Sequence, residues 1–262
     1  MCLIIYKPAG ITITGKQNYK HVFDMNSDGI GYAVRVNKSL IEYQKGVSLN
    51  NAEMLFNEIG EKQAVIHFRQ ATHGIISPKM CHPFPITIHD KKILSLHGFT
   101  DAVFFHNGIL KDYGDEKFSD TADYVKTLAG FYSVQDLSKA PAIESLKAEC
   151  NGGKFLLMLP KNITVLIGRF IKDEKTGLYY SNESYKWNDG YWSYPVSKYR
   201  LRSIRYSWES YQDYYNNNSL YDNDGIPLDD DDDDDDDGAF NQYMRKNIAR
   251  EEEEEDKRYF NF

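Results

Sequence analysis

Short apolar runs rich in β-branched and aromatic residues recur along the front of the chain and predict β-strands. The predicted strands are 2–6, 29–36, 39–44, 64–68, 92–98, 103–107, 153–160 and 162–171. Most of these strands are of the antiparallel hairpin type. Only Pro160 and Lys161 separate the last two apolar runs, so these two strands are predicted to form a hairpin.

Helical patterns lie between the strands, at 50–60, 119–131 and roughly 140–150. In the first of them Ala52, Met54, Leu55 and Ile59 form one apolar face. In the second, Ser119 is predicted to be the helix N-cap, because acidic residues follow it in the first turn. Strands and helices grouped in separate blocks predict the α+β class, since a doubly wound fold would alternate them.

The pattern ends after Trp192, where the composition becomes aromatic, Asn-rich and acidic. Residues 1–192 carry 22 Lys and Arg against 20 Asp and Glu, whereas residues 193–262 carry 9 against 19. The net charge of −8 therefore belongs to the tail. The sequence predicts a folded domain at 2–192 and a tail at 193–262. The tail is predicted to be disordered around 222–238, where nine consecutive aspartates repel one another.

Several classes of protein are disfavoured by composition. No apolar run reaches the roughly 18 residues that cross a bilayer, and no targeting segment is evident, so we expect a cytoplasmic protein without membrane or nucleic-acid partners. If the chain is viral, the cytoplasm would be that of the host. Three cysteines without CxxC spacing, and histidines without HxH or HxxxH spacing, predict no disulfide framework, no metal site and no cofactor.

Cys2 follows the initiator methionine, and a small second residue permits removal of Met1. The freed α-amine, with an ordinary pKa of roughly 7.7–8.0, could then act as base for the adjacent thiol. The alternative is that Cys2 is simply the first residue of a buried strand. Taken alone, the Met-Cys start favours that alternative.

Three further features fit a catalytic site around Cys2, and each has a plainer explanation. Arg69 at a strand end offers a two-donor fork for a carboxylate, or forms a surface ion pair. Asn107 and Gly108 offer two adjacent N–H donors for an oxyanion, or form a hairpin turn. Asp120 at a helix start could hold an ammonium group, or cap the helix.

Together these motifs resemble a known family. The sequence carries MCLI at its start, GIGYA at 29–33, HFRQATHG at 67–74, CHPF at 81–84, FHNG at 105–108, SDT at 119–121 and YYSNESY at 179–185. Their order and spacing resemble the glutaminase domain of the class II glutamine amidotransferases, which have an N-terminal nucleophile. The resemblance covers about residues 2–190.

The resemblance implies a role for each matching residue. Cys2 would be the nucleophile and its α-amine the base, while Asn107 and Gly108 would form the oxyanion hole. Arg69 would bind the α-carboxylate of glutamine, and Thr72 and His73 would complete the wall of the substrate site around it. Asp120 would bind the α-ammonium. The implied fold is a four-layer αββα sandwich of two antiparallel sheets.

Two departures from the family pattern affect the expected function. Gln70 stands where many relatives have tryptophan, which leaves the closure of the glutamine loop undefined. Larger relatives also continue into a synthase domain, whereas here the low-complexity tail follows, so no acceptor site is expected within the chain.

The expected function is hydrolysis of the glutamine side-chain amide through a Cys2 thioester, giving glutamate and ammonia. A separate synthase or ligase would then use the ammonia. Two alternatives remain open at this point. One is an amidohydrolase acting on γ-glutamyl amides or peptides, and the other is an inactive glutaminase-type domain that serves as an interaction module.

Overall fold

The computed structural model describes residues 2–12, 20–71 and 76–186. All of them belong to the first of two compact units, Met1–Arg200. The tail predicted at 193–262, and the disorder predicted around 222–238, lie outside the described residues. Within the described ranges, no helix is both long enough and apolar enough to cross a membrane.

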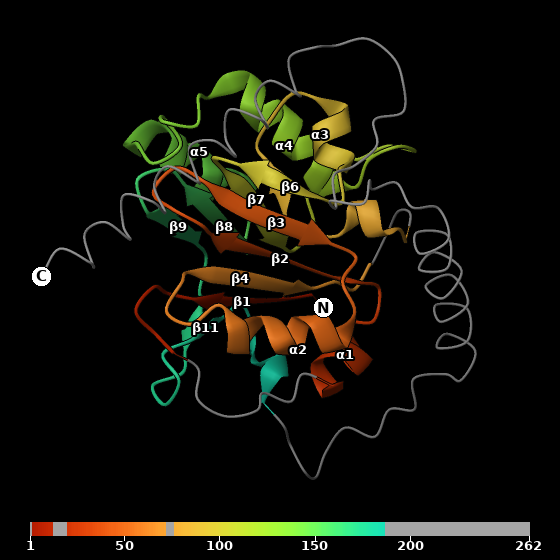
Figure 1. The fold of residues 1–262 in the computed structure, drawn as a ribbon. Helices are drawn as coiled ribbons and strands as arrows, with labels where there is room; N and C mark the ends of the chain where they lie inside the picture. Colours follow the sequence, from red (N-terminus) through yellow and green to blue (C-terminus); the bar gives the residue numbers. More distant parts are fainter. Residues whose placement is uncertain (1, 13–19, 72–75, 187–262) are drawn as a thin grey trace, which may run out of the picture. The chain divides into compact units, whose positions relative to one another are not determined.

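Two antiparallel sheets form the centre of this unit (Figure 1). The larger sheet has seven strands in the order β10 (Ile171–Lys172), β11 (Tyr179–Tyr180), β1 (Leu3–Lys7), β4 (Ala64–Phe68), β2 (Ile30–Arg35), β3 (Ile41–Lys45) and β6 (His97–Thr100). The smaller sheet has four strands in the order β5 (Phe84–Pro85), β7 (Val103–Asn107), β8 (Lys154–Leu159) and β9 (Ile163–Ile167). The predicted α+β class with two antiparallel sheets is confirmed.

Five α-helices are described on the outer faces of the sheets and at their ends. They are α1 (Lys20–Met25), α2 (Leu49–Glu58), α3 (Asp90–Leu94), α4 (Asp120–Phe131) and α5 (Ala140–Cys150). Short 3-10 helices occur at η1 (Pro78–Met80) and η2 (Glu183–Tyr185). Ser119 is the N-cap of α4 and its side chain accepts a hydrogen bond from the Ala122 N–H, as the sequence predicted.

Buried apolar side chains hold these layers together, because successive residues of a strand point to opposite faces. Between the two sheets lie Ile4, Val65, Phe105 and Leu156, among others. The opposite face of the larger sheet packs Leu3 and Ile66 with Val22 of α1 and Ala52 of α2. The opposite face of the smaller sheet packs Phe104 and Leu157 with Val125 of α4 and Leu146 of α5.

Two sequence predictions about strands are wrong in part. The strand predicted at 92–98 begins only at His97, because Asp90–Leu94 form helix α3. A short apolar run does not distinguish one turn of helix from a strand. The strand predicted at 162–171 ends at Ile167, since Gly168 adopts φ 84° and turns the chain towards the other sheet. Helix α1 was not predicted.

A close backbone crossing fixes the segment before β5 over the larger sheet. A Cβ added to Gly31 in β2 would lie 1.9 Å from the carbonyl oxygen of His82 and 3.0 Å from that of Gln44. Only glycine leaves room for this approach. The crossing places His82 between the two sheets, with its ring 6.5 Å from that of Phe105.

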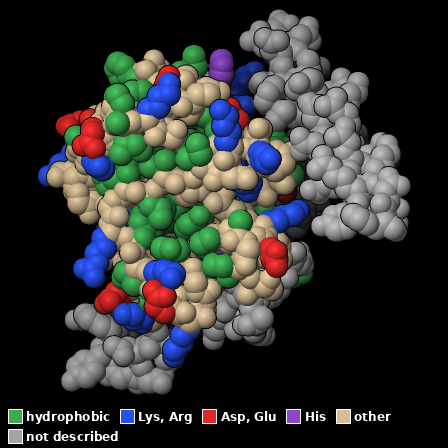
Figure 2. All heavy atoms as spheres, turned by 90° about the vertical axis from the view of Figure 1, so that its left-hand side faces the viewer, with side chains coloured by type: hydrophobic (Ala, Val, Ile, Leu, Met, Phe, Trp, Pro, Cys, Tyr) green, Lys and Arg blue, Asp and Glu red, His purple; other side chains and the backbone are tan. Residues whose placement is uncertain are grey.

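Strand β9 forms one edge of the smaller sheet, and its side chains Ile163–Leu166 are half-buried. Figure 2, which looks at the side of the molecule where β9 lies in Figure 1, shows apolar side chains gathered across the middle of this face.

Candidate active site

Four of the seven predicted site residues line one cavity of about 640 Å³. Cys2, Arg69, Gly108 and Asp120 all line it, although they come from four separate segments. Cys2 precedes β1, Arg69 follows β4, Gly108 follows β7, and Asp120 begins α4. The pairing of Leu3 with Phe68 places the first two side by side.

The Cys2 thiol faces the backbone of Gln70. Its Sγ accepts a hydrogen bond from the Gln70 N–H at 3.2 Å and lies 3.3 Å from the Gln70 carbonyl oxygen, to which it can donate. Burial raises the pKa of the Cys2 thiol above its ordinary value, while the Gln70 N–H and the charge of Arg69 act in the opposite direction. The thiol therefore stays protonated near neutral pH, so a nearby base is needed to form the nucleophilic thiolate.

Two side-chain amides hold the backbone carbonyl of Cys2, and Ser181 links one of them to β1. Its carbonyl oxygen accepts hydrogen bonds from the side-chain amides of Asn107 and Asn182, each at 2.7 Å. The Asn107 amide also donates to the Ser181 hydroxyl at 2.8 Å, and that hydroxyl accepts from the Ile4 N–H at 2.9 Å. Ser181 and Asn182 were missed as site residues. Their sequence signal was a Ser-Asn pair directly after a short aromatic strand.

Gly108 lines the cavity, whereas Asn107 is not among its lining residues. Both N–H bonds of the Asn107 side chain are engaged, one by Cys2 and one by Ser181. Gly108 lines the cavity itself. A Cβ at this position would lie 2.6 Å from His106 Nε2 and 3.2 Å from the Cα of Gly153, so the site requires glycine here.

Arg69 is 5% exposed and belongs to a segment that Asp28 holds in place. The Asp28 N–H donates to the Arg69 carbonyl at 3.0 Å, and its carboxylate accepts from the Ala71 N–H at 2.7 Å. Two hydrogen bonds thus fix the chain on either side of Gln70. The predicted substrate-wall residues Thr72 and His73 lie outside the described residues.

Asp120 is held by the start of its own helix and by the loop before it. One carboxylate oxygen accepts from the Leu110 N–H at 3.0 Å, and the other accepts from the Thr121 N–H at 2.7 Å. A carboxylate offers about four acceptor positions, so Asp120 retains capacity for a cationic ligand.

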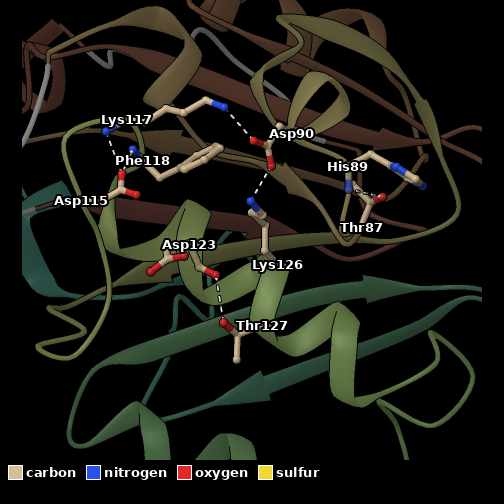
Figure 3. A network of polar contacts seen from close by, with 9 residues as sticks. All are labelled: Thr87, His89, Asp90, Asp115, Lys117, Phe118, Asp123, Lys126 and Thr127. Atoms are coloured by element: carbon tan, nitrogen blue, oxygen red, sulfur yellow. Dashed lines mark hydrogen bonds and ion pairs between the residues drawn. The ribbon is translucent and has the colours of Figure 1, made fainter. Parts of the chain in front are cut away.

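Residues 114–118 form one wall of the cavity, and a polar network braces them (Figure 3). The Asp115 carboxylate accepts from the N–H groups of Lys117 and Phe118 at 2.7 and 2.6 Å. Asp90 of α3 binds the Lys117 ammonium at 2.7 Å and that of Lys126 on α4 at 2.5 Å. Because two helices hold this loop through one carboxylate, the wall has a defined position.

Three motif histidines, His67, His82 and His106, are buried, and burial keeps their rings neutral. The rings of His67 and His82 lie 4.1 Å apart. Burial lowers the pKa of His67 to about 3 and that of His106 to about 4. Among the described residues, no group of three or more His, Cys, Asp or Glu is placed to hold a metal ion.

The other two cysteines, Cys81 and Cys150, are buried free thiols. Burial raises the pKa of Cys81 to about 11, so it forms almost no thiolate at neutral pH. Nearby, the Lys45 ammonium donates to the Ile93 and Lys79 carbonyl oxygens, and burial lowers its pKa to about 7. Neither Lys45 nor Cys81 lines the cavity.

Comparison of the sequence with known protein families and with curated proteins finds no match.

Proposed function

We propose that this chain hydrolyses the side-chain amide of glutamine, with Cys2 as the nucleophile. The observation that supports the proposal best is the shared cavity of Cys2, Arg69, Gly108 and Asp120. A thiol, a guanidinium, a backbone N–H at a glycine and a carboxylate match the four chemical groups of the substrate. These are the amide carbon, the α-carboxylate, the amide oxygen and the α-ammonium.

In the proposed reaction the Cys2 thiolate adds to the glutamine δ-carbon, and the C–N bond of the tetrahedral intermediate then breaks. The departing nitrogen takes up the proton that the thiol lost, and ammonia leaves. Water then attacks the thioester, which gives glutamate and returns a proton to the sulfur. No redox partner is needed.

The base in this scheme is the α-amine of Cys2, which exists only after Met1 is removed. The raised pKa of the thiol supports the need for such a base. The Gly108 N–H and the Asn107 amide would hold the oxyanion. Because both N–H bonds of Asn107 are engaged, one of them has to exchange its partner when the substrate binds.

We also propose that the fold is the αββα sandwich of N-terminal-nucleophile hydrolases. Three apolar cores support it, one between the sheets and one on the outer face of each. Free ammonia is wasted unless another enzyme consumes it. We therefore propose a separate synthase or ligase as the partner of this chain.

A second candidate substrate class is the γ-glutamyl amides, in which the amide nitrogen carries a substituent. The cavity volume favours it, because about 640 Å³ lies within the 300–1,000 Å³ range of pockets for drug-sized ligands, which are larger than one amino acid. Assays of γ-glutamyl amides beside glutamine distinguish the two classes by their kcat/KM values.

Replacing Arg69 with lysine should raise the KM for glutamine by roughly ten- to a hundredfold, because lysine cannot form the two-donor contact with a carboxylate. The kcat should change little. Steady-state kinetics on glutamine measure both quantities.

Arg35→Lys is the matched control. Arg35 is also a buried arginine of the larger sheet, but it lies at the opposite end of β2 and donates to Gln63 at 2.6 Å. This variant should keep the wild-type KM. An unchanged KM in Arg69→Lys would contradict the role of Arg69.

A further inference from the structure

His106 is the buried histidine whose hydrogen bonds leave one ring nitrogen for a ligand. It is 3% exposed and lines the cavity beside Gly108. Its Nδ1 lies 2.9 Å from the Thr121 hydroxyl. No hydrogen bond from the described residues reaches Nε2.

The Thr121 hydroxyl decides which nitrogen of His106 carries the proton. This hydroxyl lies 3.2 Å from a carboxylate oxygen of Asp120, which can only accept, so it donates its hydrogen there. Towards His106 the hydroxyl can then act only as an acceptor. When the hydroxyl donates to Asp120, Nδ1 carries the hydrogen and Nε2 of the neutral ring has a lone pair.

Gly108 keeps this lone pair accessible from the cavity, because any Cβ there would lie 2.6 Å from Nε2. The neighbouring His82 also lines the cavity, but both of its ring nitrogens are enclosed and lack hydrogen-bond partners among the described residues. Nε2 of His106 is thus a buried acceptor at the wall of the cavity. Thr121 connects it to Asp120.

A carboxylate beside a neutral imidazole acceptor suits a ligand that carries positive charge and several N–H donors. A primary ammonium group has both properties. Burial keeps the ring neutral, since it lowers the pKa of His106 to about 4. A protonated ring would instead present a positive charge to the ammonium.

We propose that His106 Nε2 is a second acceptor, with Asp120, for the α-ammonium of the substrate. This inference rests on the proposed function. In a peptide the α-nitrogen of glutamine is acylated. It then lacks the positive charge and two of the hydrogens that His106 and Asp120 would bind.

Binding to the Cys2→Ala protein tests the inference without turnover. Calorimetry compares L-glutamine with glutaramate, which keeps the amide and the carboxylate but lacks the α-amine. His106→Asn retains a polar atom near Thr121 and removes the atom at Nε2. It should weaken glutamine binding about tenfold or more and leave glutaramate binding unchanged. His106→Gln, whose side chain reaches the Nε2 position, should restore most of the glutamine affinity.

The outcomes separate the two proposals. Equal effects of His106→Asn on both ligands, or no effect on glutamine, would overturn the role of His106 and leave the glutaminase proposal standing. Absence of glutamine binding to the Cys2→Ala protein would overturn both. Thermal unfolding of each variant reports whether it folds, and His106→Gln provides the second test if His106→Asn does not.

Discussion

Replacing Cys2 with alanine should lower glutamine hydrolysis by at least about a thousandfold, because no other group in the cavity can form the thioester. The thermal stability should change little. The hydrogen bonds from Asn107 and Asn182 end on the backbone carbonyl of residue 2, which alanine retains. Ammonia release and glutamate formation measure the activity.

Cys150→Ala is the control for this variant. Cys150 is a buried thiol at the end of α5 and does not line the cavity, so its replacement should retain activity. Glutaminase activity that survives in Cys2→Ala but is lost in Cys150→Ala would place the chemistry elsewhere in the molecule.

Replacing Gly31 with alanine should be the most destabilising single-methyl change in the sheet. The new Cβ would lie 1.9 Å from the His82 carbonyl oxygen, and neither that backbone nor β2 can move without breaking sheet pairing. We expect a loss of more than about 3 kcal/mol in the free energy of unfolding. Urea denaturation followed by circular dichroism measures it.

Gly130→Ala is the matched control, and it should raise the free energy of unfolding where Gly31→Ala lowers it. Gly130 lies in α4, and a Cβ there would meet no atom within 4 Å. Alanine should therefore stabilise the helix by about 0.5–1 kcal/mol. Similar stabilities of the Gly31→Ala and wild-type proteins would contradict the close crossing at His82.

Much of the fold was predictable because its signals are local. The strands around Ile4, Val65 and Phe105 read as short β-branched and aromatic runs, and Ser119 marked the start of α4. The error at Asp90–Leu94 arose because a single turn of helix leaves no distinct period in the sequence. The crossing at Gly31 depends on a residue about fifty positions away, so no local pattern could show it.

Sequence motifs named the candidate site residues, but they did not show how these residues lie relative to one another. Arg69, Gly108 and Asp120 line one cavity together with Cys2. The structure adds Ser181, which links Asn107 to β1 across a long sequence separation. That pairing depends on how the sheets stack, which apolar periodicity does not encode. The roles of all these residues in catalysis stay predictions.

Both side-chain N–H bonds of Asn107 already have partners, which bears on its proposed role in binding the oxyanion. Its amide now holds the Cys2 carbonyl and the Ser181 hydroxyl. Asn182 also donates to that carbonyl at 2.7 Å, so Asn107 can release the Cys2 carbonyl without leaving it unpaired. In the proposed reaction, this alternative partner would free one Asn107 N–H to turn towards the oxyanion.

Covalent labelling with 6-diazo-5-oxo-norleucine, a glutamine-like electrophile, tests the central claim most directly. Intact mass and peptide mapping locate the adduct. We predict a single adduct on the sulfur of Cys2 in a chain that has lost Met1, and protection by excess glutamine. A chain that keeps Met1, or an adduct on Cys81 or Cys150, would contradict Cys2 as the N-terminal nucleophile.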